Sequence, residues 1–240
     1  MSRLGVLIPA YNAGQTLAGV LARMPAAPER IVVVNDGSRD DTSALAHRLA
    51  ADDPRLRVID LERNLGYGGA VKRGLCALLE AGVEVAACVH ADGQYAPEEL
   101  PAMQAALEER GLDILQGSRL ASGTALSGGM PLYKYVAGRA LTALENRVLG
   151  LEMTDYHSGY LLFSRRALEQ IDYARLSDSF DFDLEMIAAA RALGLSVGER
   201  PIPTHYGDEV SHLNPLTYGL RVLGVMLRFV SGRYRRLGAC

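Results

Sequence analysis

The 240-residue sequence lacks most of the features that mark specialised classes of protein. It has only three cysteines, Cys76, Cys88 and Cys240, which are too few and too scattered for a disulfide framework. The 25 Lys and Arg residues nearly balance the 28 Asp and Glu residues, which gives no support for nucleic-acid binding. No apolar run reaches the roughly 18 to 20 residues needed to span a bilayer. The phosphate-loop pattern of NTPases and internal repeats are also absent, so the sequence indicates an ordinary globular protein.

The cysteines and the first residues indicate where the protein acts. Cys76 and Cys88 lie in apolar runs, so we expect buried, reduced thiols, which are typical of a cytosolic protein. Met1–Arg3 lead directly into an expected strand, without the pattern of a signal peptide. We therefore expect a cytoplasmic protein, with the cytoplasmic face of a membrane as one place of action.

Strands and helices alternate in the first half of the chain. Short apolar runs predict strands at residues 4–8, 31–34, 57–61, 85–89 and 113–117. Apolar residues at helical spacing predict helices at residues 15–24, 41–51, 70–80 and 97–109. This order predicts an α/β fold with a mostly parallel central sheet and helices on both faces.

The second half of the chain is less regular. Residues 120–132 are rich in small residues and predict a mobile loop. Helices are expected at residues 133–149 and 182–193, and strands at residues 159–163 and 196–200. No linker is evident, so we expect a single domain over residues 1–215.

Polar residues follow each of the five strands predicted in the first half. They are Tyr11 and Asn12, Asp36, Asn64, His90–Gln94, and Ser118 with Arg119. Ligands of open α/β sheets bind at the carboxyl ends of the strands. Turn propensity alone would not readily place polar clusters after all five strands, so the pattern predicts a binding site at this edge.

One segment resembles a dinucleotide-binding loop but does not fit it. In GYGGAV, residues 66–71, Val71 stands where the last glycine should be. The segment follows the third strand rather than the first, and no acidic residue follows at the right distance. A Rossmann dehydrogenase is therefore not expected.

The segment after the fourth strand has the pattern His90-x-Asp92-x-Gln94. Alternate positions just past a strand can point the same way, so these three side chains can converge. A ring nitrogen, a carboxylate and a carbonyl oxygen together could hold a divalent cation that bridges phosphate oxygens. The alternative is an Asp-Gly turn with a bystander histidine, and this segment alone does not decide between them.

Seven segments in this order and spacing carry a family resemblance: VLIPAYN, VVVNDGSRDDT, NLGYGGAVKRG, HADGQYAPEEL, GSR, GGMPLYKY and YHSGY. The chain resembles the family 2 glycosyltransferases of the GT-A fold over residues 4–210, most of all the branch of dolichyl-phosphate mannose and glucose synthases. The resemblance implies an inverting, metal-dependent enzyme that moves glucose or mannose from a nucleotide-diphosphate sugar, such as UDP-glucose or GDP-mannose, to a polyprenyl phosphate. It implies a nucleotide-sugar half at residues 1–117 and an acceptor half at residues 118–215.

The resemblance also implies roles for residues of the nucleotide-sugar half. Pro9, Tyr11 and Asp36 match residues that hold the base and ribose of the donor. Asp36 can accept from a base N–H, and Tyr11 offers a flat ring face. Asn64 and Lys72 match positions near the sugar and the diphosphate.

The metal site expected from the resemblance departs from the family pattern. His90, Asp92 and Gln94 match an Asp-x-Asp-x-Gln motif for Mn²⁺ or Mg²⁺, with Asp92 the central catalytic carboxylate. A histidine in the first position lowers the negative charge of the site and favours Mn²⁺, since imidazole suits the softer ion. Ala13 also stands where many relatives have an acidic residue, which puts donor affinity and base preference in doubt.

In the acceptor half, Arg119 and Lys134 match positions that contact the acceptor phosphate in relatives. A hydroxyl acceptor would need a carboxylate base, whereas a phosphate acceptor is already anionic. Asp155 is the preferred base, and we expect Asp183 to serve a first helical turn instead. His157 could approach the acceptor or the diphosphate, or stabilise its own loop.

Residues 216–237 predict a helix that is apolar nearly all round. Arg221 and Arg228 share one stripe, and Arg233, Arg235 and Arg236 cluster at its end. The segment 216–240 therefore either packs on the domain or on a second subunit, or lies on a membrane surface as an amphipathic helix.

Two alternatives to lipid glycosylation remain open from the sequence. The first is the same enzyme class with a soluble hydroxyl acceptor, either a glycan or a small metabolite. The second is a catalytically silent protein that binds nucleotide sugars, which only the departure at His90 suggests.

Overall fold

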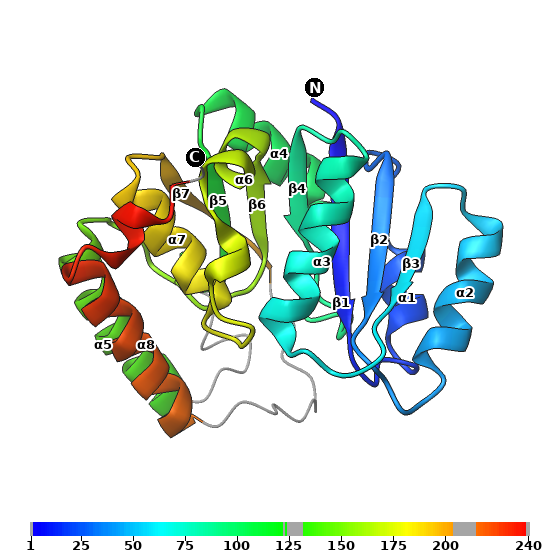
Figure 1. Cartoon of the computed structure of the whole chain (residues 1–240), viewed down its shortest axis with the longest axis horizontal. Coiled ribbons are helices and arrows are strands. Elements are labelled where there is room, and N and C mark those ends of the chain that lie inside the picture. Colours follow the sequence, from blue (N-terminus) through cyan, green and yellow to red (C-terminus); the bar gives the residue numbers. More distant parts are fainter. Residues whose placement is uncertain (1, 122, 124–131, 204–214, 239–240) are drawn as a thin grey trace.

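The computed structural model describes residues 2–121, 123, 132–203 and 215–238. Its centre is a seven-stranded sheet with the order β3-β2-β1-β4-β6-β5-β7 (Figure 1). The strands are β1 (Leu4–Ala10), β2 (Arg30–Asn35), β3 (Leu56–Asp60), β4 (Val85–Cys88), β5 (Ile114–Ser118), β6 (Leu161–Ser164) and β7 (Val197–Pro201). β6 runs antiparallel to both of its neighbours, and the other pairs are parallel, which confirms the predicted α/β fold.

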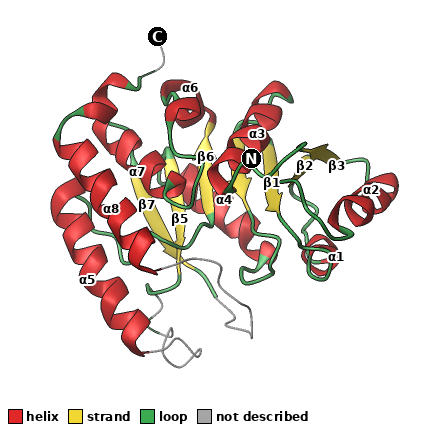
Figure 2. Cartoon of the chain, turned by 60° about the horizontal axis from the view of Figure 1, so that its bottom comes forward, coloured by secondary structure: helices red, strands yellow, loops and turns green. Residues whose placement is uncertain are grey.

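Helices cover both faces of the sheet (Figure 2). They are α1 (Leu17–Ala22), α2 (Thr42–Asp52), α3 (Tyr67–Glu80), α4 (Leu100–Glu109), α5 (Leu132–Leu149), α6 (Arg165–Gln170), α7 (Phe182–Ala192) and α8 (Pro215–Val230). Neighbouring residues of β1 point to opposite faces, so Leu7 joins the core beneath α3 and α7 while Val6 and Ile8 join the core of α1 and α4. The continuous apolar runs of the central strands follow from this burial on both faces.

β1 continues two residues beyond the predicted stop at Pro9. The carbonyl of Leu7 accepts from Val89 on the β4 side, and alternate residues of a strand face the same neighbour. Pro9 therefore faces the β4 side too, beyond the last β1–β4 pair, Leu7 with Cys88. Proline has no backbone N–H, and at this position its absence removes no hydrogen bond from the sheet.

Several shorter features differ from the sequence prediction. The helix predicted over residues 216–237 ends at Val230, and Gly232 with φ +75° separates it from a 3₁₀ turn, η3 (Arg233–Arg236). The helix predicted over residues 97–109 begins with a 3₁₀ turn, η1 (Pro97–Glu99), whereas the 3₁₀ turn η2 (Tyr173–Arg175) and the helix α6 were not predicted. Most of the loop predicted at residues 120–132 lies outside the described residues, as does Cys240.

The cysteine prediction is right for one residue and wrong for another. Cys88 is a fully buried free thiol in β4, as expected. Cys76 is a free thiol that is exposed, because it lies on the outer side of α3. The apolar run around it belongs to the inward-facing residues Leu75 and Leu78.

The helices α5 and α8 lie side by side at the edge of the molecule beyond β7, and α8 also packs on α7 (Figures 1 and 2). Three residues of α8, Val222, Val225 and Met226, enter the core with α7. None of the helices in the described part of the chain has the length and apolar character that a membrane crossing requires.

Candidate active site

The loops after β1, β2 and β3 are tied together at the carboxyl edge of the sheet. The backbone N–H of Asn12 donates to the Ser38 hydroxyl at 2.9 Å. The carboxylate of Asp36 accepts from the backbone N–H groups of Leu65 at 2.7 Å and Gly66 at 3.0 Å. The polar residues that follow these strands therefore gather at one edge, as the sequence predicts.

Two of the predicted donor residues have clear positions in these loops. Tyr11 is 46% exposed, so its ring face is open to a planar ligand. Asp36 is buried, and burial raises the pKa of its carboxyl group, against the lowering effect of its two backbone donors. Asp36 thus holds the loop after β3 in place. The side chain of Asn64 is exposed and accepts from the backbone of Gly66 at 3.0 Å.

Lys72 departs from the donor-site prediction. Its ammonium group donates to the carbonyl groups of Ala174, at 3.3 Å, and Leu176, at 2.5 Å, and pairs with the Asp178 carboxylate at 2.8 Å. An ammonium group has three donors, and these three oxygens use them all. In this structure Lys72 therefore fixes residues 174–178 to α3 and does not reach for a diphosphate.

His90 follows β4 and has its ring between two tyrosines. The ring centroids lie 5.4 Å from Tyr67 and 5.3 Å from Tyr95, both edge to face, and Nε2 of His90 is 3.2 Å from the Tyr67 hydroxyl. Burial lowers the pKa of His90, so the ring favours its neutral form. A Cβ at Gly159, whose φ is +71°, would lie 2.4 Å from the ring, so only glycine fits there.

These contacts make the His90 ring part of the wall of the site. They do not support the prediction that it ligates a metal, because Nε2 is directed at protein groups. Tyr67, which holds the ring, was not singled out from the sequence. Its place within the glycine-rich segment GYGG after the third strand was the available sequence signal.

Asp92 and Gln94 are the other predicted metal ligands. Asp92 Oδ1 accepts from the backbone N–H of Gln94 at 3.0 Å across Gly93, which is the Asp-Gly turn of the alternative prediction. Among the described residues, no group of three or more His, Cys, Asp and Glu side chains could hold a metal ion. The oxygen donors of Asp92 and Gln94 fit a hard cation held by one or two protein ligands and completed by phosphate oxygens and water. They do not fit an all-protein metal cage.

Asp183 lies in the first turn of α7, as predicted, but it also faces the site. Its Oδ2 accepts from the Tyr67 hydroxyl at 2.8 Å, so Asp183, Tyr67 and His90 form one hydrogen-bonded chain. Its Oδ1 is buried without a hydrogen-bond partner among the described residues. Burial raises the pKa of Asp183 to about 7, which suits a group that exchanges protons near neutral pH.

Arg119 and Asp155 form a two-point ion pair. The guanidinium contacts the two carboxylate oxygens at 2.7 and 3.0 Å, and the backbone N–H of His157 donates to Asp155 at 2.9 Å. Burial is the largest single effect and would raise the pKa of Asp155, but the charge and hydrogen bonds of Arg119 together with those of His157 outweigh it and lower the pKa. Because both oxygens are engaged and ionised, this geometry does not support the prediction that Asp155 is a base.

His157 joins the acceptor side to the two outer helices. Its Nδ1 is 2.8 Å from the Tyr218 hydroxyl of α8, and its Nε2 is 3.2 Å from Oε1 of Glu145 in α5. The second contact misses hydrogen-bond geometry and acts as an ion pair when His157 is protonated. Burial raises the pKa of Glu145, which is fully buried, and His157 opposes that rise.

Neither Glu145 nor Tyr218 was predicted to belong to the site. Burial raises the pKa of Tyr218, and the charges of Asp183, Glu145 and Asp155 raise it further. Lys134, the second predicted phosphate contact, lies in the first turn of α5, and its side chain is outside the described part.

Comparison with known proteins gives this arrangement a family. Residues 5–172 match the sequence profile of Glycosyl transferase family 2. A polyprenol monophosphomannose synthase of Mycolicibacterium smegmatis is 34% identical over 201 residues, which cover 82% of this chain and 75% of that protein. An undecaprenyl-phosphate mannosyltransferase of Micrococcus luteus is 32% identical over 203 residues, which cover 83% of this chain and 82% of that protein.

Solved structures share the fold at lower identity. The UDP complex of glucosyl-3-phosphoglycerate synthase from Mycobacterium tuberculosis has a TM-score of 0.70 at 19% identity, covering 96% of this chain and 80% of that chain. Its complex with Mn²⁺, UDP-glucose and phosphoglyceric acid has a TM-score of 0.67. Because the profile covers more than half of the chain and both relatives exceed 30% identity, the chain belongs to Glycosyl transferase family 2 and is a glycosyltransferase.

Proposed function

We propose that this glycosyltransferase moves a hexose, glucose or mannose, from a nucleotide-diphosphate sugar to a polyprenyl phosphate with inversion. The names of the two relatives from M. smegmatis and M. luteus support this acceptor class. The observation that carries the proposal is the Arg119–Asp155 pair. The carboxylate that the sequence favours as a base is held ionised by a cation, whereas a phosphate acceptor brings its own negative charge and needs no base.

On the donor side, Pro9, Tyr11 and Asp36 would hold the base and ribose, with Asn64 towards the sugar and diphosphate. Tyr11 supplies an exposed ring for stacking, and Asp36 keeps two adjoining loops in one shape. A divalent cation, Mn²⁺ or Mg²⁺, would be held by Asp92 and Gln94, and when bound it would stabilise the charge of the leaving diphosphate.

On the acceptor side, Arg119 and Lys134 would bind the phosphate. One phosphate oxygen attacks the anomeric carbon from the face opposite the diphosphate. The bond from that carbon to the diphosphate oxygen breaks, and the nucleoside diphosphate leaves with the electron pair. The buried wall of His90, Tyr67 and Tyr95 excludes water, which would otherwise compete as the acceptor.

The test is transfer of radiolabelled sugar from UDP-glucose and from GDP-mannose, each with Mn²⁺ or Mg²⁺, into extracted polyprenyl phosphate. Label in the lipid phase is expected with one donor, and it identifies the donor and the acceptor class together. Donor hydrolysis without lipid labelling, in all four combinations, would reject the lipid acceptor.

A soluble hydroxyl acceptor is the second candidate, and Asp183 favours it. A buried carboxyl group with a pKa of about 7 and an unpartnered oxygen is suited to take a proton from a hydroxyl. A solved structure of the same fold holds the soluble acid phosphoglyceric acid. With a hydroxyl acceptor, Asp183→Asn should lower kcat by about 10²- to 10⁴-fold, because the base is lost. With a phosphate acceptor, kcat should fall by less than about tenfold.

A further inference from the structure

One face of α8 exposes a stripe of large apolar side chains. Leu220, Leu223, Leu227 and Val230 are 70%, 44%, 71% and 73% exposed. Their spacing of three and four residues places them on one side of the helix. The opposite side, with Val222 and Val225, is buried against the domain. We call these four exposed residues the α8 stripe.

The charge around the α8 stripe has one sign. Residues 215–238 contain five arginines and no acidic residue, although the whole chain has a net charge of -3. Arg233, Arg235 and Arg236 are exposed in the turn η3 at the end of the helix. An exposed apolar stripe that ends in a basic cluster is the pattern of a segment that lies on an anionic membrane surface.

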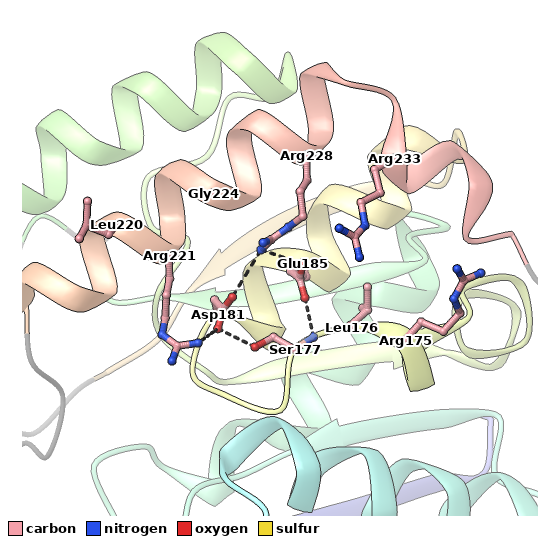
Figure 3. A pocket seen from close by; sticks show the side chains of 10 residues that line it. All are labelled: Arg175, Leu176, Ser177, Asp181, Glu185, Leu220, Arg221, Gly224, Arg228 and Arg233. Atoms are coloured by element: carbon pink, nitrogen blue, oxygen red, sulfur yellow. Dashed lines mark hydrogen bonds and ion pairs between the residues drawn. The ribbon is translucent and has the colours of Figure 1, made fainter.

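Ion pairs from two arginines of α8 hold the helix against the domain (Figure 3). Arg228 pairs with Glu185 at 3.0 Å and Arg221 with Asp181 at 3.3 Å, and both carboxylates are buried, Glu185 in α7 and Asp181 at its N-cap. The Tyr234 hydroxyl of η3 also donates to Glu185 at 2.6 Å. These contacts surround a cavity of about 450 Å³ between α7 and α8. The helix is thus anchored through its arginine side, and the stripe remains exposed, although Leu220 also lines this cavity.

We propose that the α8 stripe and the arginines of η3 dock on an anionic lipid bilayer, with α8 lying in the plane of the surface. The helix has 16 residues and is about 24 Å long, which gives the contact its length. A second copy of the chain fits this face less well, because the same segment of the copy has no acidic residue to pair with the arginines of η3. The inference rests on the proposed function only in that a polyprenyl phosphate is a membrane lipid.

The amino-terminal end of α8 leads into the acceptor side of the site. Tyr218, two residues before the α8 stripe begins, contacts His157 at 2.8 Å. His157 is two residues from Asp155, the partner of Arg119. A bilayer on the α8 stripe would therefore border the region where Arg119 is proposed to meet the acceptor phosphate. The acceptor would then enter from the lipid surface without leaving it.

Binding to vesicles tests the proposal without any turnover. Wild-type protein should sediment with phosphatidylcholine vesicles that contain phosphatidylglycerol, and much less with pure phosphatidylcholine. Arg235→Gln/Arg236→Gln should weaken binding about 10- to 30-fold, from the loss of two charges near the surface. The matched variant Arg48→Gln/Arg57→Gln removes two exposed arginines at the opposite edge of the sheet and should bind as the wild type does. Equal binding by the two double variants would overturn the assignment of the surface.

A fluorescence probe tests the stripe itself. The chain has no tryptophan, so Leu227→Trp introduces a single indole on the stripe, and Ala51→Trp places one on exposed α2 as the control. Emission should shift to the blue on anionic vesicles for Leu227→Trp only. An unshifted spectrum, or a blue shift at Leu227→Trp that appears only as the protein dimerises in the absence of lipid, would reject the bilayer as the occupant.

Activity separates this inference from the proposed function. Leu220→Asn/Leu227→Asn should lose vesicle binding but keep turnover of a short-chain, water-soluble polyprenyl phosphate, because both side chains are exposed. Vesicle binding by the wild type with no transfer to any polyprenyl phosphate would reject the proposed function and leave the docking surface standing. Transfer to a polyprenyl phosphate without vesicle binding would reject the docking surface and leave the proposed function standing.

Discussion

The two halves of the molecule bury charge in different ways. In residues 1–117, the buried acids are Asp36 and Asp113, which accept mainly from backbone N–H and hydroxyl groups. In the described part after residue 117, five acids are buried: Glu145, Asp155, Asp181, Asp183 and Glu185. Their partners are the charged or polar side chains of arginine, histidine and tyrosine. The proposed donor half, residues 1–117, is organised by backbone geometry, and the proposed acceptor half by side-chain charge.

This difference predicts which part of the molecule should lose stability when one charged group is removed. Buried ion pairs contribute little net stability, because desolvation offsets the attraction between the charges. Breaking one of them is costly, since it leaves a buried charge without its partner. The folding stability of the second half should therefore respond strongly to the removal of one charge and to pH, whereas the stability of the loops around the proposed donor residues should not. Four predictions examine this contrast.

The largest effect is expected from a carboxylate of the donor half. Asp92→Ala removes the proposed metal ligand, so donor binding that depends on Mn²⁺ should weaken at least about 100-fold. Isothermal calorimetry with and without Mn²⁺ measures this change. Glu98→Gln is the control. Glu98 is an exposed acid near the loop that holds Asp92, and its carboxylate pairs with Arg23. Unchanged donor affinity of Asp92→Ala with Mn²⁺ present would show that the metal binds elsewhere.

The second prediction compares one buried acid from each half. Asp155→Asn leaves the Arg119 charge without its partner and should lower the free energy of unfolding by about 3 kcal/mol. Asp36→Asn leaves only neutral N–H groups, so its cost should stay near 1 kcal/mol. Urea unfolding at pH 7 measures both, and equal costs would contradict the contrast between the halves. The folded pKa of Asp155 is lowered, so its contribution should be complete above about pH 4 and lost as the pH falls through the folded pKa.

The third prediction uses the opposite shift at Asp183. Its folded pKa of about 7 lies above the unfolded value, so the wild type should lose stability as the pH rises from about 4 to 7. Asp183→Asn lacks this loss and should be more stable than the wild type at pH 8, by on the order of 2 kcal/mol. At pH 5 the difference should be much smaller. Thermal unfolding at both pH values tests this, and a constant difference between the two proteins would refute the raised pKa.

The smallest effect is expected at the contact between α8 and the site. Tyr218→Phe removes the hydrogen bond to His157, which is worth about 1 kcal/mol. It should raise KM for the acceptor several-fold and leave KM for the donor unchanged. Tyr173→Phe is the matched control, since that side chain lies beside α3 and away from His157. Equal changes in both KM values would mean that the effect of Tyr218 is not confined to the acceptor side.

Most of the fold and part of the site could be predicted from the sequence. The alternation of strands and helices is encoded in local periodicity, and residues after parallel strands must share an edge, which places Tyr11, Asp36 and Asn64 together. Partners far apart in sequence carry no such signal. The carbonyls that occupy Lys72 come from Ala174 and Leu176, about one hundred residues later, and periodicity does not indicate that they fold back on α3.

Buried acids in helices were the hardest to predict. Glu145 and Tyr218 lie in helices whose apolar pattern predicts only which side of the helix is buried. In the sequence, a buried polar residue on that side cannot be told apart from an exposed residue at its edge. Asp183 satisfies the rule for acids in a first helical turn, and that rule concealed its contact with Tyr67. Lys72, predicted to lie near the diphosphate, and Asp155, the predicted base, are both paired with groups of opposite charge.

The antiparallel strand β6 has a consequence for biosynthesis. β5 does not pair with β4, so the sheet is joined across its middle only when residues 161–164 enter between them. β4 is already paired with β1 on its other side, so a nascent chain keeps one open strand edge from residue 88 to residue 164. At roughly 5–20 residues per second, the ribosome takes about 4 to 15 seconds over that stretch. During this interval the unpaired edge of β4 can bind another chain.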